Sequence, residues 1–312
     1  MFNKVLVPLD GSAGAEVTLP FAKELAARMK GVEVVLLHIV APEERGKLEP
    51  MHRAYISAAV ESIQSQAREV QKKIGIIPAN DSVKVSGETL VGYPDEEILR
   101  FAEAKGVDLI LMSTQDSSGS SRRALGHVAE KIMRQAKIPV WLVRASTRDT
   151  VPYDKWTKKT LLVVLDGSEL AESVLPHVET LVQQTGETVE VVFIRVCEPP
   201  PMPSYYSMEL SGVPLNWGQY VQQELDQCKQ ISKAYLDGVV KRFKDKNISV
   251  RSEILLGRAS AEIINYAAKN PQSVIMMTTH GRSGLGRLVY GSVAESVLLS
   301  ASNPIFLVRI TK

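Results

Sequence analysis

The sequence predicts an α/β protein with two tandem domains, each a doubly wound, Rossmann-like parallel sheet with helices on both faces. Three observations support this prediction. The second half of the chain repeats the first, short β-branched runs alternate with longer amphipathic segments, and the strand-like runs are apolar throughout. Continuous apolar strands are typical of parallel sheets that are buried on both faces. Strand–helix alternation implies right-handed crossovers between parallel strands.

The repeat is visible in segments that recur in the same order. Residues 4–12 (KVLVPLDGS) correspond to residues 160–168 (TLLVVLDGS), and residues 138–144 correspond to residues 303–309. The offset grows from 156 residues at the first pair to 165 at the last, so the second half carries about nine extra residues. A period this long indicates a duplicated domain, because solenoid repeats are roughly 20–50 residues long.

The hydrophobic pattern of the first half defines its elements in order. The predicted strands are 5–9, 32–40, 82–86, 109–113 and 140–143, and the predicted helices are 16–30, 55–74, 95–105 and 128–135. The first helix has apolar residues at helical spacing and is followed by Gly31, and the third is followed by Gly106. Glycine commonly follows a helix C-terminus, so both ends are well defined.

The second half follows the same course. Its predicted strands are 161–165, 189–196, 249–255, 273–278 and 305–309, and a long helix is predicted at 217–246. The apolar stripe expected to be buried on that helix is Leu225, Ile231, Tyr235, Leu236, Val239 and Phe243. The segment between the halves is polar and contains Pro152. We therefore place the first domain at 1–145, a linker at 146–156 and the second domain at 157–312.

Composition narrows the function classes. A chain of 312 residues with 45% hydrophobic and 23% charged residues can build two ordinary cores. A net charge of +2 does not predict nucleic acid or a membrane surface as a partner. No apolar run approaches the roughly 20 residues of a membrane span, and the early first strand leaves no room for a signal peptide. Cys197 and Cys228 are the only cysteines, so we expect a reducing cytoplasm and no disulfide framework.

The segment after the fourth strand of the second half is the strongest candidate site. In such sheets ligands bind beyond the carboxyl ends of the strands. Four glycines lie between residues 281 and 291, and a helix is expected to begin at Ser292. Glycines and a helix N-terminus suit an anion, and Arg282 and Arg287 add positive charge. The pattern predicts phosphate binding; a tight turn with a capping box from Ser292 to Glu295 remains the alternative.

These motifs resemble the universal stress protein family. The family pattern is an Asp after the first strand and, after the fourth, Gly, nine residues and Gly-Ser opening a helix; here the positions are Asp166, Gly281, Gly291 and Ser292. The resemblance covers nearly the whole chain as two tandem family domains. It implies an ATP-binding fold whose five parallel strands have the order 3-2-1-4-5. It also implies that two domains pair through their last strands, inside one chain as a pseudo-dimer or between chains as a homodimer.

The resemblance further implies which residues bind the nucleotide, with ATP as the expected cofactor, alone or with Mg²⁺. Asp166 would lie beside the adenosine, and the backbone of Val196 would contact adenine. The residues that would hold ribose and phosphates are Gly281, Gly291, Ser292 and the backbone of Val293, and Val164, Met277 and Thr278 complete the set. ATP-binding members usually have glycine at the position of Thr278, so its side chain could crowd the ribose.

The first half lacks part of this chemistry. Asp116 stands where the second half has Gly281, and His127 stands where it has Ser292, although Asp10 is retained. A carboxylate at that position disfavours phosphate. We therefore expect the nucleotide mainly in the second domain and a structural role for the first. Binding of a less anionic ligand, with His127 as a pH-sensitive contact, remains open.

These observations predict a cytoplasmic, ATP-binding regulatory stress-response protein that acts with a protein partner the sequence does not identify. A nucleotide-independent scaffold with vestigial sites and a slow ATP hydrolase are the alternatives. Efficient catalysis is not expected, because no base is placed to activate water. The histidines lack the spacing of metal ligands. His38 is expected in the core, and Ser12 and Ser168 are expected to cap helices.

Overall fold

The computed structural model describes residues 1–44, 46, 49–75, 83–114, 125–145, 151–186, 189–202, 216–280 and 290–310. The elements of the first half are β1 (Lys4–Leu9), η1 (Glu16–Thr18), α1 (Leu19–Arg28), β2 (Glu33–Val40), η2 (Pro42–Glu44), α2 (Glu49–Lys73), β3 (Lys84–Val91), α3 (Pro94–Ala104), β4 (Leu109–Ser113), α4 (His127–Gln135) and β5 (Val140–Val143). The elements that follow are η4 (Tyr153–Lys155), β6 (Thr160–Val164), α5 (Glu169–Glu172), α6 (Leu175–Thr185), β7 (Glu190–Cys197), α8 (Trp217–Lys244), β8 (Val250–Leu256), α9 (Ala259–Lys269), β9 (Ser273–Thr278), α10 (Ser292–Ser300) and β10 (Ile305–Val308).

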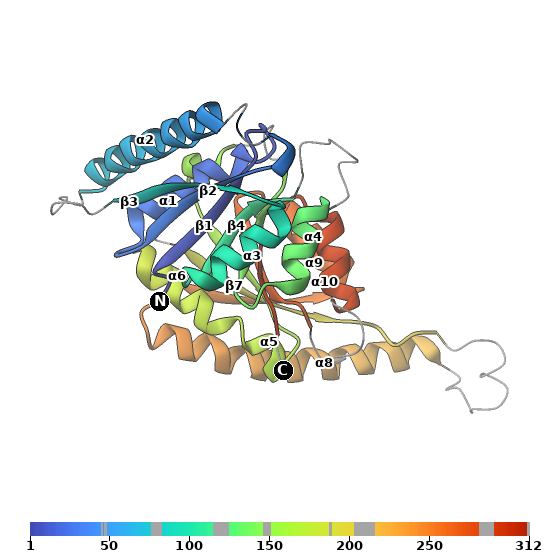
Figure 1. Ribbon diagram of the computed structural model, residues 1–312. Coiled ribbons are helices and arrows are strands. Elements are labelled where there is room, and N and C mark those ends of the chain that lie inside the picture. The colour runs from blue at the N-terminus through green and yellow to red at the C-terminus, as the bar shows by residue number, and fades with distance from the viewer. Residues whose placement is uncertain are drawn as a thin grey trace.

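The described strands form one sheet with helices on both faces (Figure 1). The strand order is β3-β2-β1-β4-β5-β10-β9-β6-β7-β8, so each half has the order 3-2-1-4-5. Neighbouring strands are parallel within each half. The last strands β5 and β10 pair antiparallel and join the two halves. The predicted fold class and strand order are confirmed, and the two domains pair within one chain.

Two apolar layers enclose the sheet because successive strand residues point to opposite faces. One layer contains Val5, Val163 and Phe306 and is covered by α1, α2, α6 and α8. The other contains Leu6 and Leu162 and is covered by α3, α4, α9 and α10. Each layer includes residues from both halves. The core is therefore continuous across the domain junction.

Element boundaries differ from the prediction where tertiary pairing extends a segment. β4, β5 and β9 have the predicted bounds, whereas α2 begins at Glu49 instead of residue 55. β3 continues to Val91 because it stays in register with β2 as far as Val40. The predicted linker 146–156 lies partly outside the described residues, and its described end forms η4.

Two expectations were wrong. The stripe proposed for the long helix included Ile231, which is 55% exposed, whereas Leu236, Val239 and Phe243 are buried as expected. The expectation of no disulfide framework also fails, because Cys197 and Cys228 form a disulfide between β7 and α8. The first error arises because α8 continues past the region that packs on the sheet.

None of the described helices is long and apolar enough to cross a bilayer.

Polar groups fasten the two halves together beside the β5–β10 pair. The side chain of Gln184 on α6 exchanges two hydrogen bonds with the backbone of Phe2, at 2.7 Å and 2.9 Å. Lys159 forms a buried ion pair of 2.8 Å with Glu24 on α1. These contacts link residues more than a hundred positions apart. The relative position of the halves is thus fixed by side chains as well as by the sheet.

Candidate functional site

A cavity of about 430 Å³ lies at the carboxyl ends of β6, β7 and β9 and at the amino ends of α9 and α10. Its lining residues are Val164, Leu165, Asp166, Ala171, Val196, Glu198, Cys228, Ala259, Ile263, Met277, Thr278, Thr279, His280, Gly291, Ser292, Val293 and Ala294. The volume falls within the roughly 300–1,000 Å³ of small-molecule sites. The cavity occupies the edge of the sheet where a parallel α/β fold places ligands.

Most of the residues predicted to bind a nucleotide meet in this cavity. Val164, Asp166, Val196, Met277, Thr278, Gly291, Ser292 and Val293 all line it. Gly281, Arg282 and Arg287 lie outside the described residues. The structure thus brings together segments from four different elements. The individual binding roles stay predictions.

Asp166 is held in a tight turn after β6. One carboxylate oxygen, Oδ1, accepts hydrogen bonds from the backbone N–H of Ser168 at 2.9 Å and from its hydroxyl at 2.6 Å. The Ser168 hydroxyl in turn accepts the N–H of Ala171 at 3.1 Å and caps α5, as predicted. Gly167 has φ +87°, and a Cβ there would lie 3.0 Å from the Arg195 guanidinium. The positive φ favours glycine in this turn, and a side chain there would also press against Arg195.

A tyrosine and a glutamate behind the turn recur in both halves. Burial, and then the carboxylate of Glu172, raises the pKa of Tyr235 above its usual value. In the first half the Tyr55 hydroxyl donates to Glu16 at 3.1 Å. Sequence comparison missed this correspondence, because the two tyrosines lie on long helices of different length. Both remain protonated at neutral pH, so neither contributes charge to the turn.

The first turn of α10 supplies the principal anion-binding feature. Gly291 is the N-cap, and its carbonyl accepts the first intrahelical bond from the N–H of Glu295 at 3.0 Å. The N–H groups of Ser292, Val293 and Ala294 therefore have no acceptor within the helix. All three residues line the cavity. Such a helix N-terminus favours an anionic group.

Two details of this turn differ from the sequence interpretation. Ser292 is the first helical residue, so the capping box with Glu295 is not formed and the hydroxyl of Ser292 is not needed to cap α10. The N–H of Gly291 donates to the carbonyl of Thr279 at 2.8 Å. Gly291 therefore lines the cavity with backbone alone, and its N–H is not a hydrogen-bond donor to a ligand.

The end of β9 is fixed by its own hydroxyl groups. The buried Thr278 hydroxyl donates to the carbonyl of His280 at 2.6 Å, and the Thr279 hydroxyl lies 3.0 Å from Nδ1 of His280. Thr278 lines the cavity at the position where the family resemblance expects glycine. His280 is buried in this arrangement.

Sequence reasoning missed Glu198 and Cys228, which also line the cavity. Oε1 of Glu198 accepts the N–H of Ala259 at 2.5 Å and so holds the start of α9. The position of Glu198 directly after a strand end was the available signal. Cys228 gave no signal, because its approach to the sheet depends on how α8 packs.

The first half has a smaller counterpart. Its cavity of about 200 Å³ is bordered by Asp10, Ile39, Pro94 and residues at the start of α4. The helix N-terminus is retained, because Gly126 donates to Thr114 at 2.7 Å in the same way as Gly291 to Thr279. Ile39 and Pro94 replace the smaller side chains Val196 and Ala259. The predicted effect of Asp116 lies outside the described residues.

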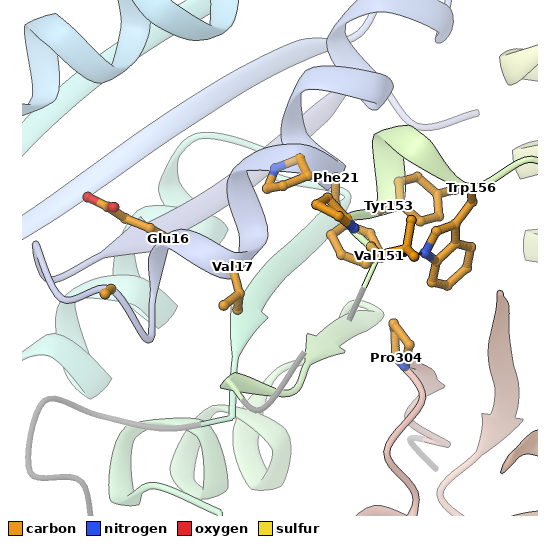
Figure 2. Close-up of a pocket in the computed structure, with 10 residues that line it drawn as sticks. Glu16, Val17, Phe21, Val151, Tyr153, Trp156 and Pro304 are labelled. Atoms are coloured by element: carbon orange, nitrogen blue, oxygen red, sulfur yellow. Dashed lines mark hydrogen bonds between the residues drawn. The ribbon is translucent and has the colours of Figure 1, made fainter. Parts of the chain in front are cut away.

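A third hollow, of about 250 Å³, lies where the halves meet (Figure 2). Figure 2 shows Phe21, Tyr153 and Trp156 lying close together along one side of it. The rings of Phe21 and Tyr153 stack at 4.2 Å, and those of Tyr153 and Trp156 meet edge to face at 4.9 Å. Its one carboxylate, Glu16, accepts the hydroxyl of Tyr55. This hollow is a packing junction, and its lining is mainly apolar and aromatic.

The family model of universal stress proteins matches the chain twice, over residues 1–144 and 158–309. The chain belongs to the universal stress protein family. A universal stress protein of Methanocaldococcus jannaschii is 30% identical over 154 residues, covering 48% of this chain and 86% of that protein. A universal stress protein of Mycolicibacterium smegmatis is 21% identical over 311 residues, covering 98% of this chain and 96% of its own length.

A solved structure shares the whole tandem fold. The crystal structure of a universal stress protein from Archaeoglobus fulgidus superposes with a TM-score of 0.62 at 21% sequence identity. The superposition covers 99% of this chain and 99% of the chain from Archaeoglobus fulgidus. The fold of the whole chain, with its two halves, is therefore found in a solved structure.

Proposed function

We propose that this universal stress protein is a cytoplasmic, regulatory ATP-binding protein that holds its nucleotide mainly in the second domain. One observation carries the proposal: the first-turn N–H groups of Ser292, Val293 and Ala294 border the same cavity as Asp166. The helix N-terminus suits the phosphates, and the carboxylate suits hydrogen-bond donors of the nucleoside. Mg²⁺ would accompany the phosphates. A protein partner, not identified by the site, would receive the signal.

The remaining lining of the cavity fits the uncharged part of a nucleotide. Val164, Val196 and Met277 supply apolar surface at the strand ends. Gly291 has no side chain, and a Cβ there would meet its nearest protein atoms at 3.6 and 3.9 Å, an ordinary contact distance. The difference of about 430 against 200 Å³ favours the second cavity for a ligand of this size. The backbone donors alone do not separate the two halves.

The proposal is tested by calorimetric titration of the purified chain with ATP. We expect about one site per chain, and a loss of roughly tenfold or more in affinity for Asp166→Ala, the range for a hydrogen bond to a charged group. Asp10→Ala is the matched control. Oδ1 of Asp10 accepts the N–H of Ser12 at 2.8 Å, so both variants lose the same turn bond.

Three outcomes would contradict the proposal. Equal losses of ATP affinity in both variants would mean that both halves bind the nucleotide, or that the loss comes from damage to the turn. Unchanged affinity in Asp166→Ala, with binding abolished in Asp10→Ala, would place the nucleotide in the first domain. Absence of binding to the unaltered chain would favour the nucleotide-independent scaffold.

A further inference from the structure

The disulfide lies in the wall of the proposed nucleotide cavity. Cys197 is the last residue of β7, and Cys228 lies on α8 with its Cα 5.9 Å away from that of Cys197. Cys197 is fully buried, whereas Cys228 is partly exposed and lines the cavity. The bond therefore connects the end of β7, which lies next to the edge strand β8, to the helix that forms one side of the site.

The residues next to Cys197 belong to the same wall. Val196 before it and Glu198 after it both line the cavity. The carbonyl of Cys197 accepts the N–H of Gly257 at 3.0 Å, and Glu198 holds the start of α9 through Ala259. A movement of the sulfur at Cys197 is thus resisted by the strand and by α9. Any movement after bond cleavage will occur on the α8 side.

The two parts of α8 differ in how they are attached. The later part buries Ser232, Leu236, Val239 and Phe243, and the ring of Phe243 meets that of Phe193 at 4.9 Å. Residues 217–231, all of which the structure describes, include no buried residue. Figure 1 shows this earlier part extending beyond the rest of the molecule.

The earlier part of α8 depends on the disulfide for its position. Its side-chain interactions run along the helix, with Gln222 donating to Asp226 and Lys229 pairing with Asp226, each at 3.0 Å. Most helical stability in proteins comes from tertiary packing, and this part of the helix buries no side chain. Among the described residues, the disulfide at Cys228 is the cross-link between this part of α8 and β7.

We propose that the Cys197–Cys228 disulfide is a redox-controlled clamp that sets the affinity of the second domain for ATP; this inference rests on the proposed function. With the bond formed, the wall at Cys228 is preorganised for the ligand. With the bond reduced, the part of α8 before Ser232 is released and must be ordered again when ATP binds. The reduced protein therefore binds ATP more weakly.

The chemical step is thiol–disulfide exchange with a dithiol reductant. One thiolate of the reductant attacks Sγ of Cys228, the more exposed sulfur, and Cys197 leaves as a thiolate that takes up a proton. The second thiol of the reductant then loses its proton and displaces Cys228 as a thiol. Two electrons pass to the protein, and the reductant ends as its own disulfide. In the first half Val40 stands in place of Cys197, so the clamp acts on one cavity.

The experiment uses the full chain in two states, oxidised with glutathione disulfide or reduced with dithiothreitol, and counts free thiols in each. Calorimetric titration with ATP is expected to show about a five- to tenfold weaker affinity in the reduced state, at the low end of known couplings between sites. Hydrogen exchange is expected to become faster in residues 217–231 after reduction and to stay unchanged in 236–244.

Variants separate the clamp from general effects of the reductant. Cys228→Ser removes the partly exposed sulfur and is expected to bind ATP like the reduced chain, with or without dithiothreitol. Gln230→Ser introduces the same side chain at an exposed position of α8 and is expected to keep the redox response. Hydrogen exchange of the later part of α8 shows that Cys228→Ser is folded.

Equal ATP affinity in the oxidised and reduced states would overturn the clamp and leave the proposed function intact. Two free thiols that persist after oxidation would also overturn it. Absence of ATP binding in both states would refute the proposed function, and the inference with it. Faster exchange across the whole chain after reduction would overturn the local mechanism.

Discussion

Replacing Arg144 tests whether a buried arginine fastens the two halves together. Arg144 follows β5, and the residue is 5% exposed. Its Nε donates to the carbonyl of Ala301 at 3.0 Å, and its Nη2 donates to the carbonyl of Leu298. Both acceptors lie at the C-terminus of α10 in the other half. Burial lowers the pKa of Arg144, but arginine stays charged at neutral pH and complements the negative end of the helix.

The expected loss follows from these contacts. Arg144→Met keeps the apolar stem and leaves two buried carbonyls without their donor. An unsatisfied buried group costs about 1–3 kcal/mol. A cation at a helix C-terminus contributes up to about 2 kcal/mol in partly buried geometry. Since these contributions overlap, we expect the free energy of unfolding to fall by about 3 kcal/mol. Urea denaturation followed by tryptophan fluorescence measures this change.

Arg309→Met is the matched control, because Arg309 occupies the equivalent position after β10 and is partly exposed. The described residues give Arg309 no buried carbonyl acceptor, and a surface substitution usually changes stability by less than about 0.5 kcal/mol. Equal losses in the two variants, or a loss below about 1 kcal/mol in Arg144→Met, would refute the reasoning. Two separate unfolding transitions would show that the halves unfold independently. The effect of Arg144→Met on stability would then be taken from the transition of the second half.

Two further predictions concern the nucleotide and pH. Gly291→Ala is expected to fold normally, since the φ of Gly291 is −69°, and to weaken ATP binding at least about tenfold because the added methyl group occupies space beside the ligand. Gly126→Ala, the equivalent change in the first half, is expected to leave ATP affinity unchanged. Calorimetry that shows unchanged ATP affinity for Gly291→Ala would contradict this prediction. Burial, and then the N-terminal ammonium, lowers the pKa of His177, which stacks on Phe2. Unfolded histidine titrates near about 6.5, so stability is complete above that pH and falls as the pH decreases toward the lower folded value. Urea midpoints of His177→Phe should lose this dependence, and parallel curves for both proteins would show that another group causes it.

The site was predictable where it depended on local chemistry. Asp166 follows β6, and Gly291 and Ser292 at the start of α10 come after β9, so parallel strands had to place them at one edge of the sheet. The identity of the N-cap was not predictable, because both Gly291 and Ser292 are acceptable caps. The backbone bond from Gly291 to Thr279 decided between them, and it joins residues that only folding brings together.

The sequence by itself determined the duplication, the order of strands and helices, and the segments that meet at the candidate site. Hydrophobic periodicity and turn residues are local properties of the chain, so they can be recognised in the sequence alone. The tertiary structure decided that β5 pairs with β10, that the second cavity is the larger, and that Cys228 reaches Cys197. Each of these features depends on how segments distant in sequence pack together. Side-chain volumes and the path of a helix determine that packing, and composition does not.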